Sequence, residues 1–167
     1  MTEATVPEKP HKPSVEEKRR MKSAARLYAV QALFQMEASG QGPDRVAREF
    51  ETFRFGLPLE DDGAELAEGD SNLFRRVLED AVVWQAKIDQ ATDHGLAASW
   101  PIDRIDPVLR ALFRAAGAEL ATPVTPPKVV INEYVEVARA FFPEGREAKF
   151  VNAVLDHMAR ALRPEAF

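Results

Sequence analysis

Residues 125–143 read TPPKVVINEYVEVARAFFP, and apolar side chains recur in this stretch every three or four positions. That spacing places them on one face of a helix. Thr125 is the predicted N-cap, the two prolines after it fit the first turn of a helix, and Pro143 ends it. The face that we expect to be buried consists of Val130, Tyr134, Val137 and Phe141. The stretch therefore predicts a helix that packs against a core.

The same spacing predicts further helices on both sides of this one. Ser14 and Ser71 are expected N-caps, and the helix after Ser71 places Val82 and Trp84 on its apolar face. Besides the stretch above, the predicted helices cover about residues 14–38, 43–56, 71–95, 107–121 and 147–162. No segment alternates between apolar and polar residues for long enough to suggest a strand. We therefore expect an all-α fold, with the helices in one bundle or in two small bundles that share a core.

Length and composition favour one folded domain. The chain has 167 residues, of which 46% are hydrophobic, and this is enough for one core. Residues 1–13 contain three prolines and lack apolar periodicity, so we expect a disordered N-terminal arm. Residues 14–164 then form a single helical domain, with an acidic loop at about residues 57–70. The chain has no apolar run of about 18 residues and no apolar leader, which predicts a cytoplasmic protein without membrane contact.

The patterns that carry most catalytic chemistry are missing from the sequence. There is no cysteine, and the three histidines lie far apart, without the spacing of metal ligands. The chain also lacks a glycine-rich phosphate loop and the G-x-S-x-G pattern of serine hydrolases. We therefore predict no catalytic residue, no metal and no cofactor, and we expect a binding protein instead of an enzyme.

Positive charge is concentrated near the start of the first helix. The whole chain has a net charge of −5, whereas residues 9–26 hold seven lysines and arginines against two glutamates, a local charge of +5. The basic cluster consists of Lys18, Arg19, Arg20, Lys22 and Arg26. Such a cluster can neutralise phosphates of a nucleic acid. A basic helix start alone is more often solvated surface, so a helical adaptor for proteins only, with a merely solubilising arm, remains an alternative.

Five stretches strengthen the nucleic-acid interpretation when they are taken in order. They read ARLYAVQALF at 25–34, DRI at 103–105, RALFR at 110–114, VINEYVEVA at 130–138 and KFVNAVL at 149–155. In this order and at these separations, they resemble the NusB family of bacterial transcription antitermination factors. The resemblance extends from about Lys18 to Pro164, and the last two stretches together are specific.

The resemblance implies both a fold and a function. The fold is all-α, with six to seven helices in two three-helix bundles packed across each other. The function is to bind the single-stranded boxA element of nascent RNA together with NusE, which is also a small-subunit ribosomal protein. Within the RNA polymerase antitermination complex, such a protein promotes read-through in ribosomal RNA operons. A basic track beside exposed aromatic rings suits single-stranded RNA.

Carried over by position, the resemblance implies two RNA-binding elements. The first is the basic cluster, with Gln31 further along the same helix. The second consists of Arg146, Lys149 and Phe150. For Arg146 a phosphate contact is expected, and for Phe150 two roles stay open, because the ring either stacks on a base or packs in the core.

The resemblance also implies a NusE site at Phe34 and Asp103. Asn132 and Asn152 stand among apolar residues, and we expect them to fix helix packing through buried hydrogen bonds rather than to bind RNA. Some ribosomal RNA cytosine methyltransferases carry a similar N-terminal helical domain, so a related RNA-binding domain that lacks the catalytic part is a second alternative. The sequence leaves open whether the chain forms a homodimer, as some relatives do.

Overall fold

The computed structural model describes residues 12–53, 55, 69–97 and 101–167, and all regular structure within these ranges is helical. The elements are α1 (Val15–Ser39), α2 (Pro43–Phe53), α3 (Ser71–Val83), α4 (Gln85–Gly95), α5 (Pro107–Ala121), α6 (Pro127–Phe141), α7 (Arg146–Leu162) and the 3-10 turn η1 (Pro164–Ala166). The all-α expectation is therefore confirmed. Among the described helices, none combines the length and the apolarity that a bilayer span requires. Most of the expected N-terminal arm and of the expected acidic loop lies outside the described residues.

Local features of the sequence set several helix ends. The Ser14 hydroxyl accepts a hydrogen bond from the N–H of Glu17 at 3.1 Å, which confirms Ser14 as the N-cap of α1. Gly40 ends α1 in the left-handed region, at φ 72°, where a side chain would be strained. Asp106 caps α5 and accepts from the N–H of Val108 at 2.8 Å. Both ends of α1 and the start of α5 thus follow from neighbouring residues.

Two predicted N-caps are wrong. Asp70, not Ser71, caps α3, because the Asp70 carboxylate accepts from the N–H of Leu73 at 3.0 Å. The Ser71 hydroxyl instead donates to a glutamate of α2 at 2.8 Å. Thr125 precedes Pro126, which occupies the N-cap position of α6, and the Thr125 hydroxyl lies 3.4 Å from a glutamate of α5. In both cases the hydroxyl is used by a carboxylate of another helix, which the local pattern does not reveal.

The segment predicted as one helix from residue 71 to residue 95 consists of two helices that meet at Trp84. Neither glycine nor proline marks this break, where Trp84 adopts φ −102° and ψ 13°. α3 packs against α1, α2 and α5, whereas α4 packs against α5 and α7. Because the chain changes packing partners here, Val82 and Trp84 are 44% and 42% exposed, not buried as predicted.

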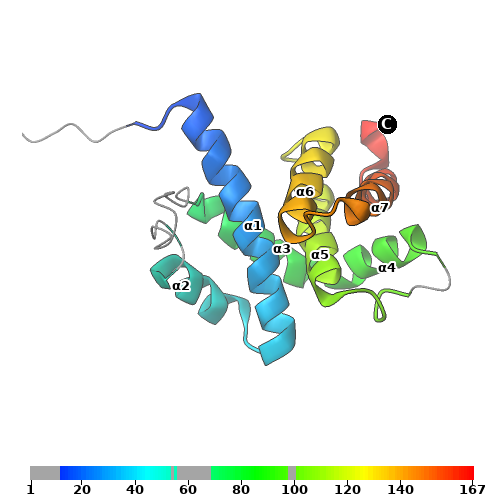
Figure 1. Ribbon diagram of the computed structural model, residues 1–167, viewed down its shortest axis with the longest axis horizontal. Helices are drawn as coiled ribbons and strands as arrows, with labels where there is room; N and C mark the ends of the chain where they lie inside the picture. Colours follow the sequence, from blue (N-terminus) through cyan, green and yellow to red (C-terminus); the bar gives the residue numbers. More distant parts are fainter. Residues whose placement is uncertain (1–11, 54, 56–68, 98–100) are drawn as a thin grey trace, which may run out of the picture.

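α5 lies at the centre of the molecule (Figure 1). α1, α2 and α3 pack together on one side of it, and on the other side α4 and α6 both pack on α7. The expected pair of bundles is thus present, with α5 packed against both. Gly117 lets α4 approach α5 closely, since a Cβ at this position would lie 2.3 Å from Cγ2 of Ile88. The fully buried side chains include Phe74, Phe113, Leu120 and Tyr134.

Arg163, directly after α7, connects the end of α7 to the end of α5. Its side chain is buried and donates to the backbone carbonyls of Leu120 at 3.2 Å and of Glu119 and Thr122 at 2.7 Å each. It also donates to the carbonyl of Thr125. These carbonyls belong to a helix end and the loop after it, where the helix itself supplies no donor and a cation is favoured. Arg163 therefore fixes the connection from α5 to α6, which forms part of the site described next.

Candidate nucleic-acid interface

The first turns of α1 carry four cations that point away from the core. Lys18, Arg19, Arg20 and Lys22 are exposed. None of them forms an ion pair with another residue in the part of the chain that the structure describes. Since no described carboxylate neutralises them, these charges are available to a polyanion.

Arg26, the fifth predicted member of the basic cluster, faces inward. Its side chain is 4% exposed, and its Nε and Nη2 atoms donate to the carboxylate of Glu119 on α5 at 2.9 and 3.0 Å. Its Nη1 lies 3.6 Å from Glu133 on α6, which also accepts a hydrogen bond from Ser23 at 2.9 Å. These contacts use the guanidinium inside the protein, so the structure does not leave Arg26 free for the RNA contact that the resemblance implies. Arg26 instead holds α1 against α5 and α6.

The surroundings of Arg26 favour its charged form. Burial opposes the charged form of Arg26, but the hydrogen bonds and the negative charge of Glu119 outweigh it and raise the pKa of Arg26. Tyr134 is completely buried nearby, and burial, followed by the charge of Glu119, raises the pKa of Tyr134 well above its ordinary value. Arg26 is therefore charged and Tyr134 neutral throughout the physiological pH range.

Lys18, Arg19 and Lys22 line an open groove of about 890 Å³, called the α1–α6 groove below, whereas the exposed Arg20 is not among its lining residues. It lies between the start of α1, the start of α3 and the connection from α5 into α6. Arg76 of α3 faces the lysines and arginines of α1 in this groove. Sequence reasoning missed Arg76, because nothing in the local pattern of α3 indicates that this helix starts beside the basic part of α1. The residues that line the groove from the α6 side include Val124, Pro126 and Val129.

The second predicted RNA-binding element lies at the start of α7. Lys149 lines a groove of about 550 Å³ between α6 and α7, called the α6–α7 groove below. Arg146 is the first residue of α7 and is exposed. Phe150 is 38% exposed, and its ring meets the buried ring of Phe113 edge to face, with 6.1 Å between centroids. Phe150 thus packs partly in the core while part of its ring surface stays exposed to solvent.

Asn132 on α6 and Asn152 on α7 are both exposed, so the buried packing role expected for them is wrong. Both line the α6–α7 groove. Asn132 also lines the α1–α6 groove, so the two grooves meet at this residue. The apolar neighbours in the sequence misled the prediction, because both asparagines stand at the border of the apolar face of their helix, where the groove admits solvent.

A third groove, of about 510 Å³, lies beside the second half of α1 and is called the Phe34 groove below. Phe34 lines it and is 39% exposed. Gln31 lines the same groove, so the structure places it beside the predicted partner site and apart from the exposed basic cluster. Val108 of α5 and Phe141 of α6 complete its apolar lining. An exposed ring in a mainly apolar groove is typical of a protein–protein contact.

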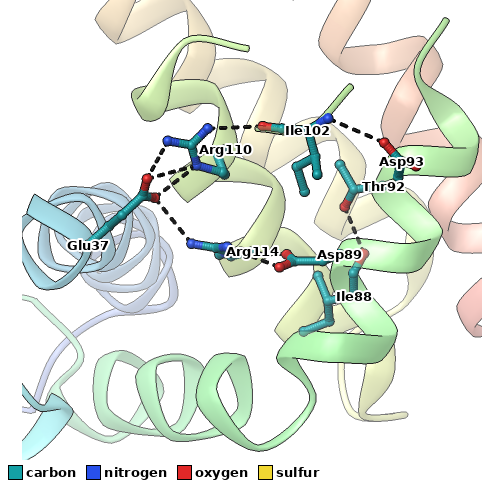
Figure 2. A network of polar contacts seen from close by, with 8 residues as sticks. All are labelled: Glu37, Ile88, Asp89, Thr92, Asp93, Ile102, Arg110 and Arg114. Carbon is teal, nitrogen blue, oxygen red and sulfur yellow. Dashed lines mark hydrogen bonds and ion pairs between the residues drawn. The ribbon is translucent and has the colours of Figure 1, made fainter. Parts of the chain in front are cut away.

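An ion network holds α1 to α5 close to this groove (Figure 2). Glu37 accepts hydrogen bonds from Nε of Arg110 at 2.9 and 3.0 Å and from Nη1 of Arg114 at 3.2 Å. Arg114 also donates to Asp89 of α4, at 3.1 and 3.0 Å. The hydrogen bonds from Arg110 outweigh the opposing effect of partial burial and lower the pKa of Glu37. The network therefore joins α1, α4 and α5.

Asp103, the other predicted partner residue, is exposed in the segment before α5. Arg110 holds this segment, because its Nη1 donates to the carbonyl oxygen of Ile102 at 2.9 Å. The hydrogen bond to Glu37 raises the pKa of Arg110 against the opposing effect of partial burial, and the negative charges of Glu37, Asp89 and Asp103 add to this increase. Arg110 thus fixes both the α1 residues near Phe34 and the segment that carries Asp103.

Comparison with known sequences gives a consistent set of relatives. The family model described as the NusB family matches residues 23–160. The transcription antitermination protein NusB of Maricaulis maris (strain MCS10) is 46% identical over 153 residues, which cover 91% of this chain and 94% of that protein. The protein of the same name from Caulobacter vibrioides (strain ATCC 19089 / CIP 103742 / CB 15) is 48% identical over 143 residues, which cover 85% of this chain and 94% of that protein.

Comparison with solved structures gives the same fold. The T. maritima NusB structure matches with a TM-score of 0.64 at 26% identity, and the match covers 90% of this chain and 93% of that chain. A chain in the crystal structure of the antitermination factors NusB and NusE in complex with dsRNA matches with a TM-score of 0.66 at 22% identity. The match covers 89% of this chain and 99% of that chain. The arrangement of helices around α5 is therefore shared with these structures.

Proposed function

The chain belongs to the NusB family and is a transcription antitermination protein, and we propose that it acts by holding a single-stranded RNA and a ribosomal protein on one helical body. The proposed RNA is a boxA-like element of a nascent transcript, and the proposed protein partner is NusE. Bound to RNA polymerase in the cytoplasm, this assembly promotes read-through of ribosomal RNA operons.

The observation that carries RNA binding is the positive charge of the α1–α6 groove. In a chain with a net charge of −5, five cationic side chains line this groove against two carboxylates. The charge of Arg26 is paired with the buried carboxylate of Glu119. The accessible charge therefore belongs to Lys18, Arg19, Lys22 and Arg76. Such a groove attracts phosphates, and its apolar wall suits nucleobases.

For NusE we propose the Phe34 groove together with Asp103. The exposed ring offers an apolar anchor, and Asp103 offers a charge at the rim, the usual arrangement of a protein–protein interface. The lining residues of this groove differ from those of the α1–α6 groove. RNA and NusE can therefore occupy the chain at the same time, as the proposed function requires.

Membership of this family makes the chain a non-enzymatic factor. The relatives match over 94% of their own length, which gives no support to the alternative of a domain related to that of the methyltransferases. A protein-only adaptor differs from our proposal in one measurable respect, because it has no salt-dependent affinity for RNA.

Titration of a boxA-like single-stranded RNA into the full chain, with and without NusE, tests the proposal. We expect the affinity to fall as salt rises, with a log–log slope of roughly −0.7 for each neutralised phosphate, and to increase when NusE is present. Replacing Lys18, Arg19 and Lys22, the three exposed α1 cations that line this groove, with alanine should reduce the magnitude of this slope by about 2.

The matched control replaces Arg45, Arg48 and Lys87 with alanine. These cations are also exposed but lie on α2 and α4 and line none of the three grooves. The control should keep the slope of the unmodified chain, which separates a local contact from an effect of net charge. Absence of RNA binding at low salt with NusE present, or equal slopes for both triple variants, would contradict the proposal.

A further inference from the structure

The two grooves beside the RNA-binding elements lie along one stripe of α6. Val129, Asn132, Glu136 and Arg139 follow one another at intervals of three or four residues, so they share one side of the helix. Val129 lines the α1–α6 groove, Glu136 and Arg139 line the α6–α7 groove, and Asn132 lines both. From residue 129 to residue 139 the stripe is about 15 Å long, at ~1.5 Å per residue. This length corresponds to roughly four stacked nucleotides, at about 3.4 Å each.

The carboxylates that line the two grooves contact other groups of the protein, whereas two cations that line the grooves form no ion pair within the described residues. Asp70 caps α3, Glu133 accepts contacts from α1, and Glu136 pairs with an arginine of α6. Arg76 and Lys149 are exposed and form no ion pair with any residue in the described ranges. Each groove thus contains a cation without an ion-pair partner among the described residues, Arg76 in one and Lys149 in the other. The neutral amide of Asn132 lies where the grooves meet.

We propose that a single strand of RNA runs without interruption along this stripe, from the α1–α6 groove into the α6–α7 groove, and contacts Arg76, Asn132 and Asn152. The inference rests on the proposed RNA-binding function and adds three contacts to those assigned from the sequence. Arg76 and Lys149 bind phosphates in the two grooves. Asn132, at the junction, offers the donor and the acceptor of its amide to the edge of an unstacked base, and Asn152 does the same in the second groove.

The walls of the α1–α6 groove favour a nucleic acid over an acidic peptide. Val124 and Val129 are 63% and 42% exposed, and both line the groove opposite the cations of α1. Each nucleotide brings a phosphate for a cation and a flat base for an apolar surface. A peptide rich in glutamate brings the negative charge without the flat apolar face, so it satisfies only one wall of the groove.

The test measures the affinity of the full chain, with NusE present, for a boxA-like single-stranded RNA. We expect Arg76→Ala to weaken binding and to reduce the magnitude of the salt slope by about 0.7. Asn132→Ala and Asn152→Ala should each weaken binding about fivefold or more without changing the slope, because they remove base contacts and no charge. Asn132→Asp should weaken binding further than Asn132→Ala, since it places a negative charge beside the phosphates.

The controls are Arg45→Ala on α2 and Gln90→Ala on α4, both exposed and outside the three grooves. Thermal unfolding checks that each variant folds, which is expected because all five positions are exposed. If the unmodified chain binds and the α1 triple variant weakens binding, but Arg76 and both asparagine variants match the controls, the continuous path is overturned while RNA binding stands. If the unmodified chain binds no RNA, the proposed function and the path both fail. Displacement of the RNA by poly-glutamate of equal charge would also overturn the path.

Discussion

Arg26 and Glu119 form an ion pair that is nearly sealed from solvent, with side chains 4% and 3% exposed. Replacing Glu119 with glutamine leaves the buried guanidinium with only the more distant Glu133, 3.6 Å from its Nη1, as a counter-charge. Breaking one partner of a buried pair is strongly destabilising, so we expect Glu119→Gln to lower the free energy of unfolding by roughly 3 to 5 kcal/mol. Urea denaturation followed by circular dichroism measures this difference.

Two comparisons separate the lost charge from the lost contact. Asp156→Asn breaks the exposed pair between Asp156 and Arg160, whose side chains are 49% and 61% exposed, and should cost at most about 0.5 kcal/mol. The double change Arg26→Met with Glu119→Leu removes both charges and should recover much of the loss, since apolar residues can replace a buried pair. Equal losses for Glu119→Gln and Asp156→Asn would show that the buried pair is no anchor.

For single residues, the sequence indicates the chemical nature of a side chain better than it indicates whether that side chain points into the core or toward solvent. The basic cluster could be recognised because its cations are neighbours in the chain. The inward orientation of Arg26 could not be recognised from the sequence, because its partner Glu119 lies 93 positions later in the chain. Asn132 and Asn152 were misplaced for a related reason, since their exposure depends on how α6 and α7 leave a groove between them.

At the scale of elements, helix ends that depend on nearby residues were predictable. Ser14 and Gly40 bound α1 through contacts within one turn, and the bounds predicted for α5 agree with the structure. The division at Trp84 was not predictable, because no glycine or proline marks it and the cause is a change of packing partners. The local sequence around Trp84 is compatible with one continuous helix. Tertiary packing therefore determines where α3 ends and α4 begins.

Glu37 connects α1 to α5 in a way that depends on pH. The hydrogen bonds from Arg110 hold the pKa of Glu37 below its ordinary value of 4.5, so the folded chain keeps this carboxylate charged at pH values where the unfolded chain protonates it. Its contribution to stability is complete above the ordinary value and is lost as the pH falls through the lower folded value. We expect Glu37→Gln to cost about 1 kcal/mol or less near neutral pH, because the pair is partly exposed, and to cost nothing in strong acid.

Urea denaturation of both chains between about pH 7 and pH 3 measures this convergence. Glu136→Gln serves as the control, since its partner Arg139 lies on the same helix and both side chains are more than half exposed. A difference between Glu37→Gln and the unmodified chain that stayed constant down to the lowest pH would show that the Glu37 charge contributes nothing.

At the scale of the whole molecule, α5 decides whether the two bundles form. It packs against α1, α3, α4, α6 and α7, and its inward residues are buried on all of these sides. A chain cut after Gly95 keeps four helices but loses this common surface. We expect it to show no cooperative unfolding transition by calorimetry, whereas the full chain should show one. A cooperative transition in the shorter piece would mean that the first bundle folds alone.

The location of the basic groove could be predicted from charge asymmetry alone, because one short stretch reverses the sign of an acidic chain. The extent of this groove could not be predicted from the sequence. Arg76 and Asn132 join the cations of α1 only after α3 and α6 have packed beside that helix. α1 thus supplies most of the positive charge of this groove, and the packing of α3 and α6 beside it gives the groove its shape and length.

The pairing of Arg26 with Glu119 also has a consequence during protein synthesis. The basic helix leaves the ribosome first, and 93 further positions must be translated before the partner carboxylate exists. Until then Arg26 has no counter-charge from α5, and the growing polypeptide presents one more arginine to surrounding RNA than the finished protein does. Once α5 has folded, Arg26 pairs with Glu119 and is buried. Incomplete and complete chains therefore differ in the positive charge that they expose to nucleic acid.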